Sequence, residues 1–174
     1  MDLVMIRWIA MLLAAVVVAL SAGGAEARAA KRPFKLSDYP LEVRKTLSVG
    51  PSTCREVEGG GKVGFARDTV RKVDFNGDGR LDYIVSFENT TCGGEKTGGF
   101  CGTGGCMVDF LVTLPSGKLR SVFVGQIHDY RILRGAPRKV RFEIFHNYCG
   151  DRPDYDKGCH RDVRIGYRQF NPVY

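Results

Sequence analysis

The sequence predicts a mainly β domain of the α+β class: a short N-terminal helix, then an antiparallel β-meander or small sandwich stapled by disulfides. Three observations support this fold class. Apolar and polar residues alternate with a period of two in several segments after Lys62, which places one face of each strand on a core and the other in water. One apolar stripe with a spacing of four precedes them. The six cysteines, an even number, all lie between Cys54 and Cys159, as in disulfide-bonded exported domains.

The first 27 residues have the pattern of an export signal. Arg7 precedes an apolar run from Trp8 to Leu20, which has signal-peptide length. Ala25-Glu26-Ala27 supplies the small residues that precede a cleavage site, and cleavage after Ala29 is a second candidate. The alternative is an uncleaved anchor, because the uncharged stretch is of borderline length. We expect a periplasmic or secreted protein with no stable membrane span after cleavage.

Cleavage leaves about 147 residues, which suits a single domain. We interpret residues 28–36 as a flexible basic lead-in and residues 37–174 as one disulfide-bonded β-rich domain. The net charge is +7, and it becomes +8 when Asp2, Arg7 and Glu26 leave with the signal. A basic cluster comprises Arg131, Arg134, Arg138, Lys139 and Arg141.

This basic cluster has two interpretations. It either forms a solvated face that keeps the protein soluble, or attracts an anionic partner such as an envelope component. Aromatic residues that would stack on bases are not interleaved with it, so nucleic acid is not expected.

Helical signals come first in the domain. Ser37 and Asp38 offer capping side chains, and Pro40 suits a first helical turn. Tyr39, Val43 and Leu47 follow at a spacing of four, which predicts a short helix with one buried face. Gly50-Pro51 is expected to break this helix, and Cys54 falls in a possible second helical turn.

Strand signals follow. The alternating segments are residues 83–88, 108–114, 120–126, 139–144 and 163–168. The short connections between successive segments indicate a meander. Residues 89–105, rich in glycine and cysteine and without periodicity, are interpreted as a disulfide-pinned loop.

The cysteines have two possible uses. Cys149 and Cys159 bracket a short polar loop between two strand-like runs, so we pair them. The pairing of the first four cysteines (Cys54, Cys92, Cys101 and Cys106) stays open. Zinc binding is the alternative, since Cys101 and Cys106 are spaced as in a zinc knuckle; export into an oxidising compartment favours disulfides.

The most specific motif is the segment 74–82. Side-chain oxygens occur at alternate positions in Asp74, Asn76 and Asp78, and Asp82 closes the set. Hard divalent cations bind several oxygens at once, and the two glycines of the segment let the backbone fold so that these oxygens converge. The alternative is that Asn-Gly and Asp-Gly are simply hairpin-turn dipeptides. Three carboxylates close together would repel one another without a cation, and this favours a calcium site.

An EF-hand does not fit this segment, because the twelfth position counted from Asp74 is Val85, which cannot bind a metal. The segment Asp74-x-Asn76-Gly-Asp78-Gly-x-x-Asp82, followed by a strand-like run, resembles the calcium loop of FG-GAP and VCBS repeats. That resemblance implies a strand–loop–strand site with side-chain ligands from these four residues and the main-chain carbonyl of Arg80. More broadly, the mature chain is similar to small exported proteobacterial proteins of unassigned role.

We therefore expect an exported calcium-binding protein in which Ca²⁺ is structural and the domain is a binding or interaction module. The expected partner is an anionic envelope component or another exported protein. A secreted inhibitor or effector is the alternative, and a calcium-dependent hydrolase of envelope material is less favoured. The sequence contains no Gly-x-Ser-x-Gly, His-Glu-x-x-His or phosphate-binding loop, and no catalytic residue is assigned.

Overall fold

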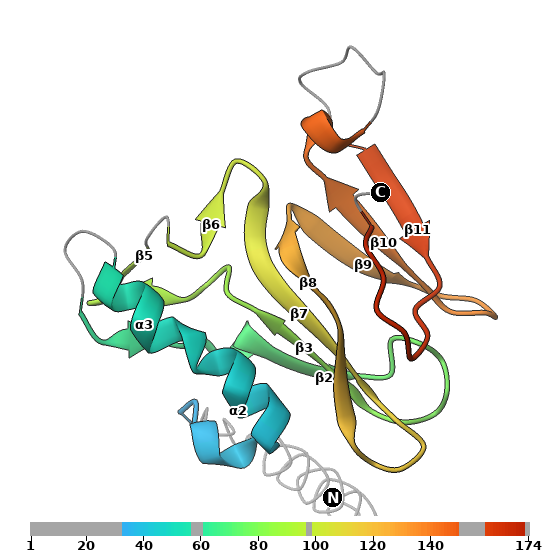
Figure 1. The fold of residues 1–174 in the computed structure, drawn as a ribbon, viewed down its shortest axis with the longest axis horizontal. Helices are drawn as coiled ribbons and strands as arrows, with labels where there is room; N and C mark the ends of the chain where they lie inside the picture. Colours follow the sequence, from blue (N-terminus) through green and yellow to red (C-terminus); the bar gives the residue numbers. More distant parts are fainter. Residues whose placement is uncertain (1–32, 57–60, 97–98, 150–158, 173–174) are drawn as a thin grey trace, which may run out of the picture. The chain divides into compact units, whose positions relative to one another are not determined.

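The computed structural model describes residues 33–56, 61–96, 99–149 and 159–172. The predicted signal peptide and residues 28–32 of the predicted lead-in lie outside these ranges. From Phe34 onward the chain belongs to one unit (Figure 1). No helix in the described ranges is long and apolar enough to cross a membrane.

Two short helices open the domain. A 3-10 turn (Leu36–Asp38) leads into α2 (Leu41–Leu47), and α3 (Val49–Glu56) follows after one residue. Val43 and Leu47 of α2 are buried, so the predicted apolar stripe is confirmed. The Gly50-Pro51 pair does not end the helical region. It lies in the first turn of α3, where proline is tolerated because its missing N–H has no helical partner.

The central sheet is antiparallel throughout. β2 (Val70–Val73) pairs with β3 (Asp82–Ser86), β3 with β7 (Gly105–Thr113), and β7 with β8 (Leu119–Ile127). The short β6 (Cys101–Gly102) forms a hairpin with the first residues of β7, on the edge that β3 occupies further along. A register shift interrupts the β7–β8 pairing between Phe110 and Leu111.

Two smaller sheets complete the fold. The meander β9 (Asp129–Leu133), β10 (Lys139–Ile144) and β11 (Cys159–Val163) forms one. The second contains β1 (Val63–Gly64), β4 (Thr91–Cys92) and β5 (Glu95–Lys96). The predicted fold class, a short helical start followed by antiparallel β-structure, is confirmed. The predicted loop 89–105 holds the short strands β4, β5 and β6.

Two hydrophobic clusters hold three layers together. One lies between the central sheet and the β9–β11 meander and contains Phe75, Phe110 and Phe142; the other lies under α2 and α3 and contains Leu47, Phe87 and Leu111. β7 is shared by both, because its alternate residues face opposite sides of the sheet. The two clusters together explain why residues 108–112 are all buried.

The chain passes from the central sheet to the meander at a single residue. His128 separates β8 from β9, and its N–H donates to the carbonyl of Glu143 in β10 at 3.0 Å. Strands that switch sheets in this way form the corner of a sandwich. The corner brings the end of β10 beside the outer edge of β8.

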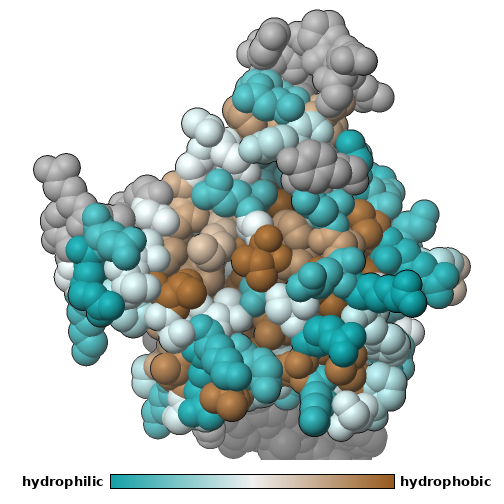
Figure 2. Space-filling view, in the orientation of Figure 1, coloured by the Kyte–Doolittle hydropathy of each residue, from teal (hydrophilic) through white to brown (hydrophobic). Residues whose placement is uncertain are grey.

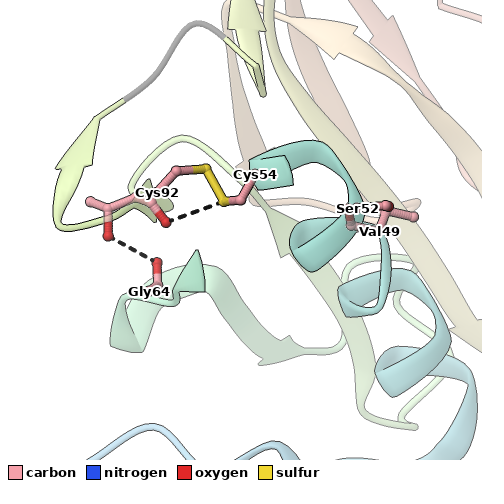
Figure 3. The surroundings of a disulfide bond; sticks show 6 residues. Val49, Ser52, Cys54, Gly64 and Cys92 are labelled. Atoms are coloured by element: carbon pink, nitrogen blue, oxygen red, sulfur yellow. Dashed lines mark hydrogen bonds between the residues drawn. A yellow bond between two sulfur atoms is a disulfide. The ribbon is translucent and has the colours of Figure 1, made fainter. Parts of the chain in front are cut away.

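Three disulfides join these elements. The predicted Cys149–Cys159 bond is confirmed, and the four cysteines left open pair as Cys54–Cys92 and Cys101–Cys106. Figure 3 shows Cys54 of α3 bonded to Cys92 of β4, with Gly64 of β1 beside them. Because all six cysteines are in disulfides, the alternative of thiolate zinc ligands is wrong.

The predicted strand at residues 163–168 is also wrong. β11 ends at Val163, and residues 164–172 form no strand. Ile165 is nevertheless buried in the hydrophobic cluster between the central sheet and the β9–β11 meander, and Val163 and Tyr167 pack against that cluster. The alternation therefore reports which side chains face the core, while the backbone of this segment makes other contacts.

The disulfides predict a graded effect on stability. Cys54–Cys92 spans 38 residues and Cys101–Cys106 spans five, and the longer loop restricts the unfolded chain more. Replacing both cysteines of the first pair with alanine should lower the free energy of unfolding by about 4 kcal/mol, against about 2 kcal/mol for the second pair. Urea denaturation of the two double variants measures this. Equal losses would contradict the chain-entropy explanation.

Candidate metal centre

The segment 74–82 connects β2 to β3 as an antiparallel hairpin whose last paired residues are Val73 and Asp82. Gly77 and Gly79 have positive φ angles of 81° and 85°, which other residues rarely adopt. At Gly77 a side chain would also approach the Cβ of Arg138 at 3.1 Å. These glycines let the backbone curl around the acidic side chains, as the sequence predicts.

Asp82 is the buried member of the loop. Its side chain has no exposed surface, and its carboxylate accepts hydrogen bonds from the backbone N–H of Thr113 at 2.8 Å and of Phe75 at 3.3 Å. The pKa of Asp82 is raised to about 6, first by burial and then by the charges of Asp78 and Asp74, while the two N–H donors oppose the change. The raised pKa therefore reflects the burial of this carboxyl first and the two neighbouring carboxylates second.

The other loop oxygens are held by the loop's own backbone. The Asp74 carboxylate accepts the N–H groups of Gly77 at 2.6 Å and Gly79 at 3.1 Å. The Asn76 side-chain oxygen accepts the N–H of Asp78 at 3.0 Å, and the Asp78 carboxylate accepts the N–H of Arg80 at 2.8 Å. These bonds are local and fix the direction of each oxygen.

Asp78 also binds groups outside the backbone of the loop. Its carboxylate lies 2.8 Å from the Arg80 guanidinium and accepts the Tyr167 hydroxyl at 2.9 Å. Burial alone would raise the pKa of Asp78, but the N–H of Arg80, the Asn76 amide, the Tyr167 hydroxyl and the Arg80 charge together lower it. Asp78 is therefore ionised at neutral pH, and it connects the loop to the C-terminal segment.

Two arginines neutralise part of the loop. Arg80 also donates to the carbonyl of Thr113 at 3.2 Å and to the Tyr167 hydroxyl. Arg138, from the connection between β9 and β10, lies 3.4 Å from the Asp74 carboxylate and donates to the carbonyl of Asp74. Protein cations thus already contact two of the three carboxylates.

The donor set suits calcium in chemical type: carboxylate, amide and carbonyl oxygens are its preferred ligands. Within the described ranges, however, no group of three histidine, cysteine, aspartate or glutamate side chains is arranged to hold an ion. Asp74 and Asp78 face arginines in this structure, so an ion between them would have to replace those contacts. The residue types suit calcium. Arg80 and Arg138 would compete with the ion for the carboxylates of Asp78 and Asp74.

The basic cluster is divided by the fold. Arg138 turns to the loop, Arg141 pairs with Asp162 at 2.7 Å, and Arg131 lies 3.7 Å from Asp129. Arg131 and Arg141 are cross-strand neighbours in β9 and β10. The exposed positive surface is therefore smaller than the sequence suggests, which weakens the interpretation of a broad anion-binding face.

The sequence pattern pointed to the five loop residues as ligands but did not connect Arg138, Thr113 or Tyr167 with the loop. Tyr167 is 89 residues from Asp78 in the chain, and its place in an alternating segment gave no sign of a polar contact. Long-range partners of this kind depend on the tertiary fold. Comparisons with models of protein families, with curated proteins and with solved structures found no match.

The raised pKa of Asp82 predicts a pH dependence of stability in calcium-free buffer. The folded state binds the Asp82 proton more tightly than the unfolded state does, so this residue contributes stability below pH ~4 that is lost as the pH rises through about 6. The free energy of unfolding of the wild type, relative to that of Asp82→Asn, should therefore increase as the pH falls from 7 to 4. Urea denaturation across that range measures the difference.

Asp162→Asn is the matched control. Asp162 lies on the surface beside Arg141, whose hydrogen bond lowers its pKa, so its contribution changes with pH in the opposite direction. A difference between the wild type and Asp82→Asn that stays constant from pH 7 to pH 4 would contradict the assignment.

Proposed function

We propose that this protein is an exported calcium-binding interaction module in which the ion has a structural role. One observation carries the proposal: three carboxylates and an amide gather within nine residues of one hairpin, and the buried one has a raised pKa. A cation among them would relieve their mutual repulsion. The resemblance of the loop to the FG-GAP and VCBS type supports the same conclusion.

The expected ligands are the side chains of Asp74, Asn76, Asp78 and Asp82 and the main-chain carbonyl of Arg80. A bound Ca²⁺ would supply positive charge inside the loop and hold its two strands together. The loop already contacts Thr113 of β7, Arg138 and Tyr167. Ordering it would therefore stabilise segments that are far apart in the sequence.

Export is supported by the predicted signal peptide and by the three disulfides, which form and persist in oxidising compartments. An interaction role is supported by small size and by the lack of a catalytic motif. The partner would be an anionic envelope component or another exported protein. A secreted inhibitor or effector is a particular case of the second.

The calcium proposal predicts a stability change. Binding to the folded state alone adds about 2.7 kcal/mol when the free ion is at about 100 times its Kd, which should raise the melting temperature by roughly 5–10 °C for a domain of this size. Asp78→Asn should abolish the rise. Asp68→Asn, an acid on the surface outside the loop, should retain it. An unchanged melting curve of the wild type from chelator to millimolar Ca²⁺ would refute the site.

Terbium luminescence tests where the ion binds. The Tyr167 hydroxyl is 2.9 Å from the Asp78 carboxylate, so excitation of tyrosine should sensitise Tb³⁺ bound in the loop, and Ca²⁺ should displace it. Tyr167→Phe should reduce the emission while leaving the calcium-dependent melting shift in place. Emission that does not change in Asp78→Asn would locate the ion elsewhere.

A further inference from the structure

The outer edge of β8 carries a second, unrelated feature. Among the described strands, β8 pairs with β7 alone, on one of its two sides. The backbone groups on its other side therefore matter, because an edge strand exposes N–H and C=O groups that another chain can pair with.

The register shows which residues point outward. Met107 of β7 uses both its backbone groups away from β8: its N–H donates to Phe100 at 2.8 Å and its carbonyl accepts from Phe87 at 3.0 Å. Met107 lies opposite Gln126, so this is a non-hydrogen-bonded pair and the backbone groups of Gln126 face outward as well. By alternation, the same holds for Val124.

Both ends of this edge are covered. At one end the Phe170 N–H donates to the carbonyl of Val122 at 3.0 Å, and at the other the His128 N–H donates to the carbonyl of Glu143 at 3.0 Å. Between them, no described residue donates to or accepts from the backbone groups of Val124 and Gln126. Two N–H and two C=O groups are thus presented in a window of the sheet edge.

A hollow of about 450 Å³ lies over this window. Its walls come from the β6–β7 turn on one side and from the segments after β10 and β11 on the other. Aromatic rings (Phe145, Tyr148, Phe170) and amides (Gln126, Asn147, Asn171) line it. Figure 2 shows brown and pale residues gathered in the middle of this face, over β7 and β8.

No described residue that lines the hollow is charged, although charged residues make up 26% of the chain. A charged ligand would find no oppositely charged side chain among these described residues. Outward N–H and C=O groups, amides and rings suit an uncharged ligand with alternating donors and acceptors and with apolar side groups. An extended peptide has this chemistry.

We propose that the window of β8 between Val122 and His128 binds an uncharged extended peptide segment of another exported protein by strand addition. The peptide backbone pairs with Val124 and Gln126, and its side chains contact the rings of Phe145 and Tyr148. The pairing continues the one that Phe170 begins at Val122 on the same edge. This inference rests on the proposed role as an interaction module and names the kind of partner.

A phage-displayed library of random heptapeptides tests the proposal. It is selected on the mature wild-type protein and counter-selected on Val124→Pro, in which the outward N–H is absent. This proline is compatible with the sheet, because that N–H does not bond to β7. The strongest sequence is then synthesised with a fluorophore. Its Kd should rise about tenfold in Val124→Pro, the loss of about one backbone hydrogen bond, and stay within about twofold in Val124→Thr.

Three further measurements hold even if Val124→Pro does not fold. N-methylation of the selected peptide at alternate positions should abolish binding to the wild type. Tyr148→Ala, outside the sheets, should weaken binding. Hydrogen exchange at the amides of Val124 and Gln126 should slow when peptide is bound.

Several results would overturn the proposal. They are failure to enrich any peptide over the counter-selection, selected peptides that depend on charged residues, and binding that survives N-methylation. Dimerisation of the wild type through this edge would also overturn it, because a second copy would then be the occupant. So would chemical-shift changes at Val124 with chitotetraose but not with peptide, because the window would then be a sugar site.

The calcium proposal and the peptide proposal can be refuted independently. A calcium-dependent melting shift without any selected peptide would refute only the window. Peptide binding in a protein whose melting temperature ignores Ca²⁺ would refute only the metal site.

Discussion

The acidic hairpin depends on the hydrogen bonds that the buried carboxylate of Asp82 accepts. This carboxylate accepts the backbone N–H groups of Phe75 and Thr113, so it joins the start of the loop to the end of β7. Phe75 is itself buried and packs edge-on against Phe110, with ring centroids 5.3 Å apart. Without the carboxylate, the N–H groups of Phe75 and Thr113 would lose these acceptors. The position of a hydrophobic side chain is thus maintained by a buried polar group.

Charge balance links the loop to the C-terminal segment. Arg80 binds Asp78 and Tyr167 together, and Arg138 binds Asp74, so two arginines from different parts of the chain neutralise part of the loop. A calcium ion would compete for the same carboxylates. Three residues beyond Tyr167, the Phe170 ring stacks on Phe123 at 5.4 Å and forms one wall of the β8 window. The segment that contacts the loop through Tyr167 thus also lines the window through Phe170.

The fold was predictable where local pattern and burial agree. Residues 139–144 alternate because one face of β10 packs on the core, and the strand has those bounds. The helix that contains Val43 and Leu47 and the Cys149–Cys159 bond could likewise be predicted from the sequence. The segment 163–168 misled because its side chains alternate into the core, although residues 164–168 form no strand. The acidic loop residues were found from spacing, whereas Arg138 and Tyr167 were not, since only tertiary packing brings them to the loop. The pairing of Cys54 with Cys92 required the same information.

The window in β8 follows from particular residues. A side chain at position 125 would meet the end of the Phe123 ring at 2.8 Å, so the ring could not keep its place over the strand if residue 125 were larger than glycine. At Gly105, with φ of 99°, a side chain would collide with the backbone carbonyl of Ile127, so the β6–β7 hairpin can lie against β8 only with glycine there. Exposed edges invite unwanted pairing, and proteins usually cover them. Here Phe170 and Glu143 cover the two ends and leave only a short central stretch, which admits a short strand and excludes a long one.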